Sequence, residues 1–159
     1  MYDMRFADLA DEIQDPRLAR LYDYWLERKG NRPYPARRDI DPVDLRYVLG
    51  HMMLLDVLRD PLRFRFRLHG AEITSRVKYD LTGKFLDDMP DPAYRDYSIA
   101  RCKGLVASGE PLVVRRDRTV ADMSCPYEAL WLPFSEDGCD VTMLLCALIY
   151  EDKRRRPIR

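Results

Sequence analysis

The segment 62–69, Leu-Arg-Phe-Arg-Phe-Arg-Leu-His, alternates apolar side chains with cationic or polar ones at every position. Alternation with a period of two is typical of a β-strand that has one buried face and one solvated face. An apolar run at 52–58 precedes it, and Asp60-Pro61 between the two predicts a turn. The two runs are therefore expected to form an antiparallel hairpin, with Phe64 and Phe66 in the core.

Three further strands are predicted toward the C-terminus, at 111–120, 127–135 and 141–150. The turn sequence Glu-Asp-Gly at 136–138 separates the last two of them. Pro133 lies inside the second and has no amide hydrogen for the ladder, which indicates a bulge or an edge position. With the hairpin, these segments predict a five-stranded antiparallel sheet.

Three of the four Asp-Pro pairs, at 15–16, 41–42 and 91–92, predict helix starts, because aspartate caps the first amides of a helix and proline fits its first turn. Helices are accordingly expected at 15–30, 41–50 and 91–109, and a short helix at 71–79 follows from the spacing of Ile73 and Val77. The order of elements predicts an α+β fold in which the long helix at 91–109 crosses the sheet between its second and third strands. A cavity is expected where this helix lies against the sheet, and such places are common ligand sites.

The first predicted helix carries an apolar stripe. It consists of Leu18, Leu21, Tyr22, Trp25 and Leu26. Spacing of three and four residues places these side chains on one face, which must be buried against the chain's own core or against a second copy. Because the stripe lies outside the predicted strand–helix–strand core, pairing with a second copy is the preferred interpretation, and a homodimer is expected.

The order of elements and four short motifs resemble the PAS family. The motifs are Asp-Pro-Val-Asp-Leu at 41–45, Phe-Arg-Phe-Arg-Leu-His-Gly at 64–70, Asp-Leu-Thr-Gly-Lys at 80–84 and Leu-Pro-Phe-Ser-Glu-Asp-Gly at 132–138. The resemblance is closest to short, single-domain bacterial PAS proteins, mostly alphaproteobacterial, and it implies a role in sensing and signalling. It divides the chain into an N-terminal segment (1–14), one PAS-like domain (15–150) and a basic tail (151–159).

Charge and hydropathy narrow the classes of protein further. The 159 residues include 27 basic and 27 acidic ones, and this balance argues against a nucleic-acid binder. The end of the chain departs from this charge balance, with the basic residues Lys153, Arg154, Arg155, Arg156 and Arg159. This basic tail is either a solvated end or a docking patch for an anionic partner. The start of the chain lacks the apolar segment of a signal peptide, and no apolar run reaches membrane-spanning length. We therefore expect a cytoplasmic protein.

Residues for metal and cofactor chemistry are scarce. No two of the four cysteines, at 102, 125, 139 and 146, have Cys-x-x-Cys spacing, and the chain has only two histidines. These nitrogen and sulfur ligands are not arranged for a zinc site, so no metal site is predicted. Among PAS relatives, haem binders place a histidine on the crossing helix, and flavin photosensors carry a reactive cysteine in an asparagine-cysteine-arginine context. This chain has neither feature at 91–108 or at 79–83, so neither haem nor flavin is expected.

Six residues are predicted to line a ligand pocket between the crossing helix and the sheet. They are Arg76, Tyr79, Phe85, Tyr97, Arg101 and Trp131. The aromatic members are expected as walls. Arg76 or Arg101 is a candidate anchor for an acidic ligand, since a buried guanidinium needs a carboxylate or similar partner. The alternative is that both arginines are solvated and that the aromatic rings fill the space themselves.

Three functions stay open at this point. The preferred one is a sensory module that binds a small molecule, a protein partner or both, without catalysis. The second is a small α+β enzyme or ligand carrier with chemistry in the cavity, against which the lack of a recognisable nucleophile–base set counts. The third is a nucleic-acid-associated regulator that uses Arg63, Arg65, Arg67 and the basic tail.

Overall fold

The computed structural model describes residues 9–151, in which five antiparallel strands form one sheet. The longer helices are α2 (Pro16–Lys29), α3 (Ala71–Val77) and α4 (Pro92–Ser108), with 3-10 turns at Arg37–Asp39, Pro42–Leu45, Leu49–His51 and Leu86–Asp88. The strands are β1 (Met52–Leu58), β2 (Arg63–His69), β3 (Leu112–Val120), β4 (Met123–Phe134) and β5 (Met143–Tyr150). Their spatial order is β2-β1-β5-β4-β3. The expected α+β fold with a crossing helix between β2 and β3 is confirmed.

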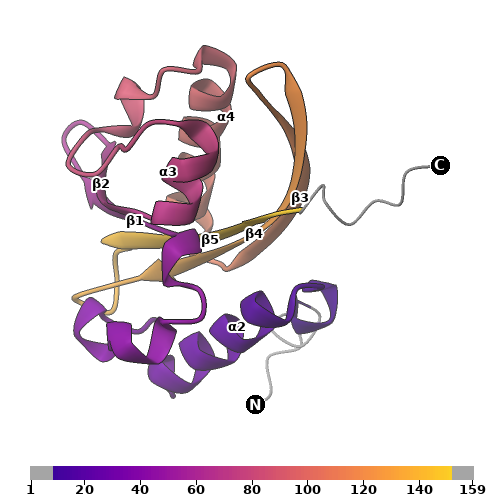
Figure 1. The fold of residues 1–159 in the computed structure, drawn as a ribbon. Helices are drawn as coiled ribbons and strands as arrows, with labels where there is room; N and C mark the ends of the chain where they lie inside the picture. The colour runs from indigo at the N-terminus through magenta and orange to yellow at the C-terminus, as the bar shows by residue number, and fades with distance from the viewer. Residues whose placement is uncertain (1–8, 152–159) are drawn as a thin grey trace.

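Both faces of the sheet are covered, α2 lying on one side and α3 and α4 on the other (Figure 1). The central strand β5 shows why. Its residues Leu144, Cys146 and Leu148 join the cluster under α3 and α4, whereas Leu145 and Ala147 join the cluster under α2. Because successive side chains of a strand point to opposite faces, a strand that is apolar throughout requires cover on both sides.

The aspartates of the three Asp-Pro pairs predicted to start helices act as caps. The side chains of Asp15, Asp41 and Asp91 each accept a hydrogen bond from an amide two or three residues later. The second expected helix, 41–50, is however two separate 3-10 turns rather than one α-helix. Val48 leaves helical geometry, with φ −133° and ψ −6°, and its side chain is fully buried.

The α2 stripe is buried within the chain itself, so the sequence-based reason for pairing it with a second copy is wrong. Its members Leu18, Leu21, Tyr22 and Trp25 are 0–2% exposed, and Leu26 packs half-buried beside them. They contact apolar side chains of β4 and β5. The indole N–H of Trp25 also donates to the carbonyl oxygen of Pro133, at 2.9 Å. Pro133 lies beyond the end of β3, where β4 is an edge, as expected.

A buried carboxylate fixes the other end of α2. Glu128 of β4 accepts hydrogen bonds from the backbone amides of Gln14 and Asp15, at 3.0 and 2.7 Å, and from the Arg115 guanidinium at 2.7 Å. The amides before the helix are thus paired, and the negative charge of Glu128 is balanced. This contact sets where α2 begins on the sheet.

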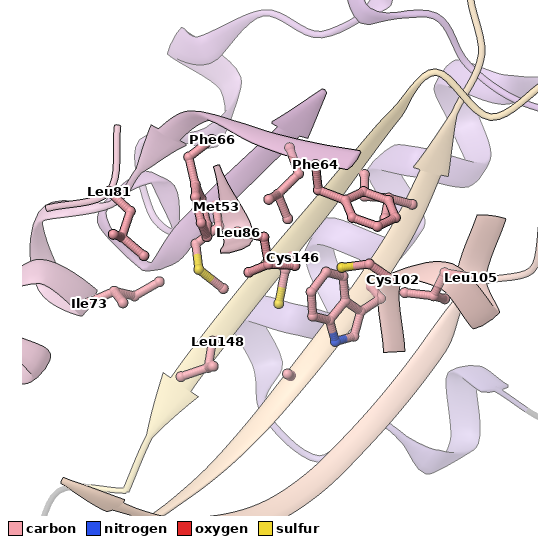
Figure 2. Close-up of a cluster of buried hydrophobic side chains, with 14 of the residues drawn as sticks. Met53, Phe64, Phe66, Ile73, Leu81, Leu86, Cys102, Leu105, Cys146 and Leu148 are labelled. Atoms are coloured by element: carbon pink, nitrogen blue, oxygen red, sulfur yellow. The ribbon is translucent and has the colours of Figure 1, made fainter. Parts of the chain in front are cut away.

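The inner cluster, drawn in Figure 2, contains Phe64 and Phe66 of the alternating strand, each 1% exposed, which confirms their predicted place. Cys102 of α4 and Cys146 of β5 lie in the same cluster. Burial raises the pKa of the Cys102 thiol to about 12, so it is a neutral apolar group at physiological pH. Of the four cysteines, Cys139 is the exposed one.

A β-bulge breaks the alternation of β2. The register with β1 shifts between Leu54 and Leu55, which pair with Leu68 and Phe66, so Arg67 is the extra residue. After the bulge, Leu68 packs toward the α2 face and His69 turns into the interior. The sequence pattern predicted the opposite for both residues.

The turn between β3 and β4 is tighter than expected. Ala121 and Asp122 have φ values of 50° and 63°, which is the geometry of a two-residue hairpin turn. Strand β4 therefore begins at Met123, four residues before the predicted start. All of β3, from Val120 back to Leu112, pairs with the part of β4 between Met123 and Trp131.

The connection from β2 to α3 is close-packed. A Cβ atom on Gly70 would lie 2.2 Å from the carbonyl oxygen of Gly50 and 2.8 Å from that of Met52. Next to it, His69 is 6% exposed, and its Nδ1 lies 2.8 Å from the Thr74 hydroxyl. Burial lowers the pKa of His69 below its ordinary value of 6.5; Asp80 opposes that shift and Arg118 adds to it.

We predict that Gly70→Ala lowers the free energy of unfolding by about 1–3 kcal/mol, because the methyl group collides with backbone that cannot move away. Gly104→Ala is the matched control. Gly104 is an exposed residue within α4, nothing lies within 4 Å of its added Cβ, and this variant should gain about 0.5–1 kcal/mol. Urea denaturation measures both, and equal stabilities of the two variants would contradict the close packing at Gly70.

We also predict that stability falls as the pH drops below 6.5. In the folded chain His69 has a lowered pKa and stays neutral, whereas in the unfolded chain it takes up a proton at its ordinary pKa. The unfolded state therefore binds more protons, and acid favours unfolding. His69→Gln should flatten the dependence of the unfolding free energy between about pH 5 and 7. Burial also lowers the pKa of His51. His51 is still present in the His69→Gln variant, so some dependence of stability on pH should remain. An unchanged slope in His69→Gln would show that burial of this ring has no effect on its titration.

Candidate functional site

The candidate site is a cavity between the sheet and the segments α3 to α4. Its volume is about 20 Å³, room for about one water molecule. Apolar side chains make up much of its wall, of which Met53, Phe66, Ile73, Leu86 and Leu148 are labelled in Figure 2. The polar lining residues are His69, Tyr79, Tyr94, Ser98, Arg118 and Tyr150. A smaller cavity of about 10 Å³ lies under α2, and its wall is mostly apolar.

The polar end of the cavity is built around Arg118 of β3. Its side chain is 6% exposed. The Nη2 atom donates to the Tyr79 hydroxyl at 2.7 Å, Nη1 lies 3.4 Å from the Tyr150 hydroxyl, and Cζ lies 3.7 Å from the centre of the Tyr94 ring. The nearest carboxylate, Asp91, is 3.7 Å away and partly exposed. A buried cation is therefore held mainly by neutral phenols.

Burial keeps the phenols of Tyr94, Tyr127 and Tyr150 protonated. It raises the pKa of Tyr94 well above 10, and raises the pKa of Tyr127 to about 12 and that of Tyr150 above its ordinary value. The Tyr94 hydroxyl donates to that of Tyr127 at 3.4 Å. The phenols thus act as hydrogen-bond donors and acceptors and supply no negative charge.

The histidine in this cavity is not arranged for nucleophilic catalysis. The Thr74 hydroxyl and an Asp80 carboxylate oxygen lie 2.8 and 4.0 Å from one ring atom of His69, Nδ1. In a hydroxyl–histidine–acid triad the hydroxyl and the acid occupy opposite ring nitrogens, so that the ring can take a proton from one while it is held by the other. The ring instead fixes the β2–α3 connection.

The structure divides the residues predicted for the pocket. Tyr79 and Trp131 line the cavity, and the other predicted residues do not. Arg76 is half-buried, with its guanidinium 5.1 Å from the centre of the Tyr150 ring. Arg101 donates to the Tyr97 hydroxyl at 3.2 Å on the same helix.

Phe85 and Tyr97 lie outside the cavity because each is covered by a guanidinium. Arg63 stacks 3.6 Å from the centre of the Phe85 ring, and Arg116 stacks 3.5 Å from that of Tyr97. Cation–π contacts of this kind hold half-exposed rings at the surface. The expected aromatic walls are thus supplied by Tyr79, Trp131 and the tyrosines that sequence reasoning did not single out.

Arg118 is the residue that sequence reasoning missed. Strand parity carries a signal for it, because Arg118 shares its parity in β3 with Leu112, Val114 and Val120, which pack on the inner cluster. An arginine at that parity is directed to the inner face of the sheet, but Arg116 has the same parity and lies exposed over the Tyr97 ring, so parity narrows the choice to two arginines. His69 had no such signal, since the bulge that turns it inward leaves no mark in the alternation.

The three arginines of the cationic face of β2 form ion pairs with two carboxylates of the same chain. Arg63 pairs with Asp87 at 2.9 Å, and Arg65 and Arg67 pair with Asp56 at 3.8 and 2.9 Å. Each arginine of this face is already held in an ion pair within the chain, which disfavours β2 as a nucleic-acid surface. The basic tail lies outside the described residues.

The cavity does not fit the large cofactors known from this fold. A volume of about 20 Å³ has no room for the ring system of a flavin or a haem, and none of the described residues that line it is a cysteine. Among residues 9–151, no group of histidines, cysteines and carboxylates is arranged to hold a metal ion. No helix in the same range is both long and apolar enough to cross a membrane.

Comparison with known proteins identifies the fold. The PAS domain of Bordetella pertussis BvgS is similar in structure, with a TM-score of 0.54 and 15% identity, and the match covers 68% of this chain and 83% of that one. A light-oxygen-voltage domain examined with a flavin analogue has a TM-score of 0.51 and 12% identity, covering 70% and 84%. The Rhodobacter sphaeroides light-oxygen-voltage protein has a TM-score of 0.50 and 12% identity, and the match covers 73% of this chain and 71% of that one.

Identities this low show a shared fold and nothing about a shared ligand. No curated protein matches the chain in sequence. The sequence profile of the PAS domain, by contrast, matches residues 13–149, which span nearly all of the described structure. The chain therefore belongs to the PAS domain family.

Proposed function

We propose that this PAS domain is a sensory module of the short bacterial kind, which binds a small molecule in its interior cavity and passes the signal to a protein partner in the cytoplasm. The PAS fold is typical of sensory signalling modules. The observation that carries the proposal is an interior cavity whose polar end holds a buried, incompletely paired Arg118. A core that only stabilised the fold would have little use for a charge at this position.

The strand β4 offers a path from the cavity to the outside. Trp131 lines the cavity, while its neighbours Leu130 and Leu132 pack under α2 on the opposite face. A ligand that moves the Trp131 ring therefore shifts the strand on which α2 rests. Trp25 is hydrogen-bonded to the next residue, Pro133, so α2 follows that movement.

The partner surface and copy number are part of the same proposal. The homodimer expected from sequence stays a prediction, and it requires a surface other than the α2 stripe, which is buried. Catalysis is left out of the proposal because the cavity pairs no nucleophile with a base: Ser98 lines it, yet the hydroxyl at the histidine is that of Thr74.

Native mass spectrometry of the protein purified from cells tests the proposal. We expect a non-covalent adduct of small mass on the wild type and its loss in Ser98→Leu, whose larger side chain fills the cavity. Ala100→Leu is the matched control, since Ala100 is exposed on the same helix, and it should keep the adduct. A wild type without adduct, or an adduct that survives in Ser98→Leu, would contradict binding in this cavity. The same spectrum gives the copy number.

A further inference from the structure

The Arg118 guanidinium has more N–H donors than there are acceptors around it. Of its five N–H groups, one on Nη2 is used by the Tyr79 hydroxyl, and one on Nη1 makes a long contact of 3.4 Å with Tyr150. Asp91 is 3.7 Å away, which is an ion-pair distance and too long for a hydrogen bond. The Nε atom is buried and has no hydrogen-bond partner among the described residues.

A buried donor without an acceptor is costly, and a buried charge without a close counter-charge is more so. The residue is 7% exposed, so bulk water does not solvate it. The surrounding phenols are neutral, and the charge of the one carboxylate in reach is shared with solvent, because the Asp91 side chain is 33% exposed. What the site lacks is therefore a negatively charged acceptor within hydrogen-bond distance of the guanidinium.

Resting on the proposed function, we propose that the cavity ligand is a small carboxylic acid, bound as its anion by the Arg118 guanidinium. A carboxylate supplies two acceptor oxygens and one negative charge, which suit a guanidinium that has a free Nε. The rest of the wall is largely apolar, including Phe66, Leu148 and Trp131, and suits the methyl group of a small acid once the wall moves outward from a cavity that now has room for about one water molecule. One arginine balances one negative charge, so a phosphate dianion is a poorer match.

The size of the cavity sets the probe. With about 20 Å³ available, the smallest acids are the ones that enter with the least movement of the wall, so acetate is the test ligand. Acetamide has nearly the same shape and no charge, and it is the matched control ligand. Arg116→Gln is the matched control variant, because Arg116 lies two residues away in β3 with an exposed guanidinium on the Tyr97 ring.

The experiment measures the thermal unfolding midpoint against ligand concentration for the wild type, Arg118→Gln, Arg118→Lys and Arg116→Gln, at ionic strength held constant with sodium chloride. A ligand that binds the folded state raises this midpoint. We expect acetate to raise it for the wild type and Arg116→Gln, and acetamide to leave it unchanged. The dissociation constant for acetate should rise roughly ten- to a hundredfold in Arg118→Gln. Arg118→Lys keeps the charge without the planar fork, and should also bind acetate more weakly.

Two results would overturn the carboxylate assignment: equal binding of acetate by the wild type and both Arg118 variants, or equal binding of acetamide and acetate. Absence of any acetate effect on the wild type would overturn it as well. Each of these leaves the proposed function standing if native mass spectrometry still shows a small adduct that Ser98→Leu removes. Should Arg118→Gln fail to fold, Arg118→Lys carries the comparison alone.

Discussion

The central constraint on this molecule is that the middle of its sheet, above all β5, is apolar on both faces and must be covered on both sides by the same chain. Strand β5 directs Leu144, Cys146 and Leu148 to one cluster and Met143, Leu145, Ala147 and Ile149 to the other. The four buried residues of the α2 stripe each contribute roughly 1.5–3 kcal/mol, a sum on the order of the total stability of a typical domain. Helix α2 is thus an integral layer of the fold, and Glu128 and the Pro133 carbonyl hold its two ends in place.

The same constraint explains where the polar groups of the interior lie. On the inner face, side chains of one parity from β3 and β4 meet the crossing helix, and Arg118 has that parity. Its charge is tolerated because two tyrosine hydroxyls, the face of the Tyr94 ring and the more distant Asp91 surround it, yet its Nε has no hydrogen-bond partner among the described residues. A site for a small molecule and the packing that stabilises the domain are therefore made from the same residues, and a ligand in the cavity alters the support of α2 through β4.

Much of the fold was predictable because its signals are local. The Asp-Pro caps, the Phe64–Phe66 alternation and the order of strands follow from neighbouring residues, and the structure confirms them. The site was less predictable, because it depends on register and on partners far along the chain. A one-residue bulge at Arg67 reverses the facing of Leu68 and His69, and stacking by Arg63 and Arg116 keeps Phe85 and Tyr97 at the surface. The α2 stripe was recognised, but its spacing does not say whether the apolar surface that receives it belongs to the same chain.

Amide hydrogen exchange of the dilute protein tests the two-sided burial most directly. If α2 is a layer of the same cooperative unit, its central amides, around Tyr22, exchange as slowly as those of β5 around Leu145, through global unfolding and independently of protein concentration. Fast exchange of α2 beside a protected β5 would contradict this account, and protection of α2 that grows with protein concentration would show that a second copy covers it instead.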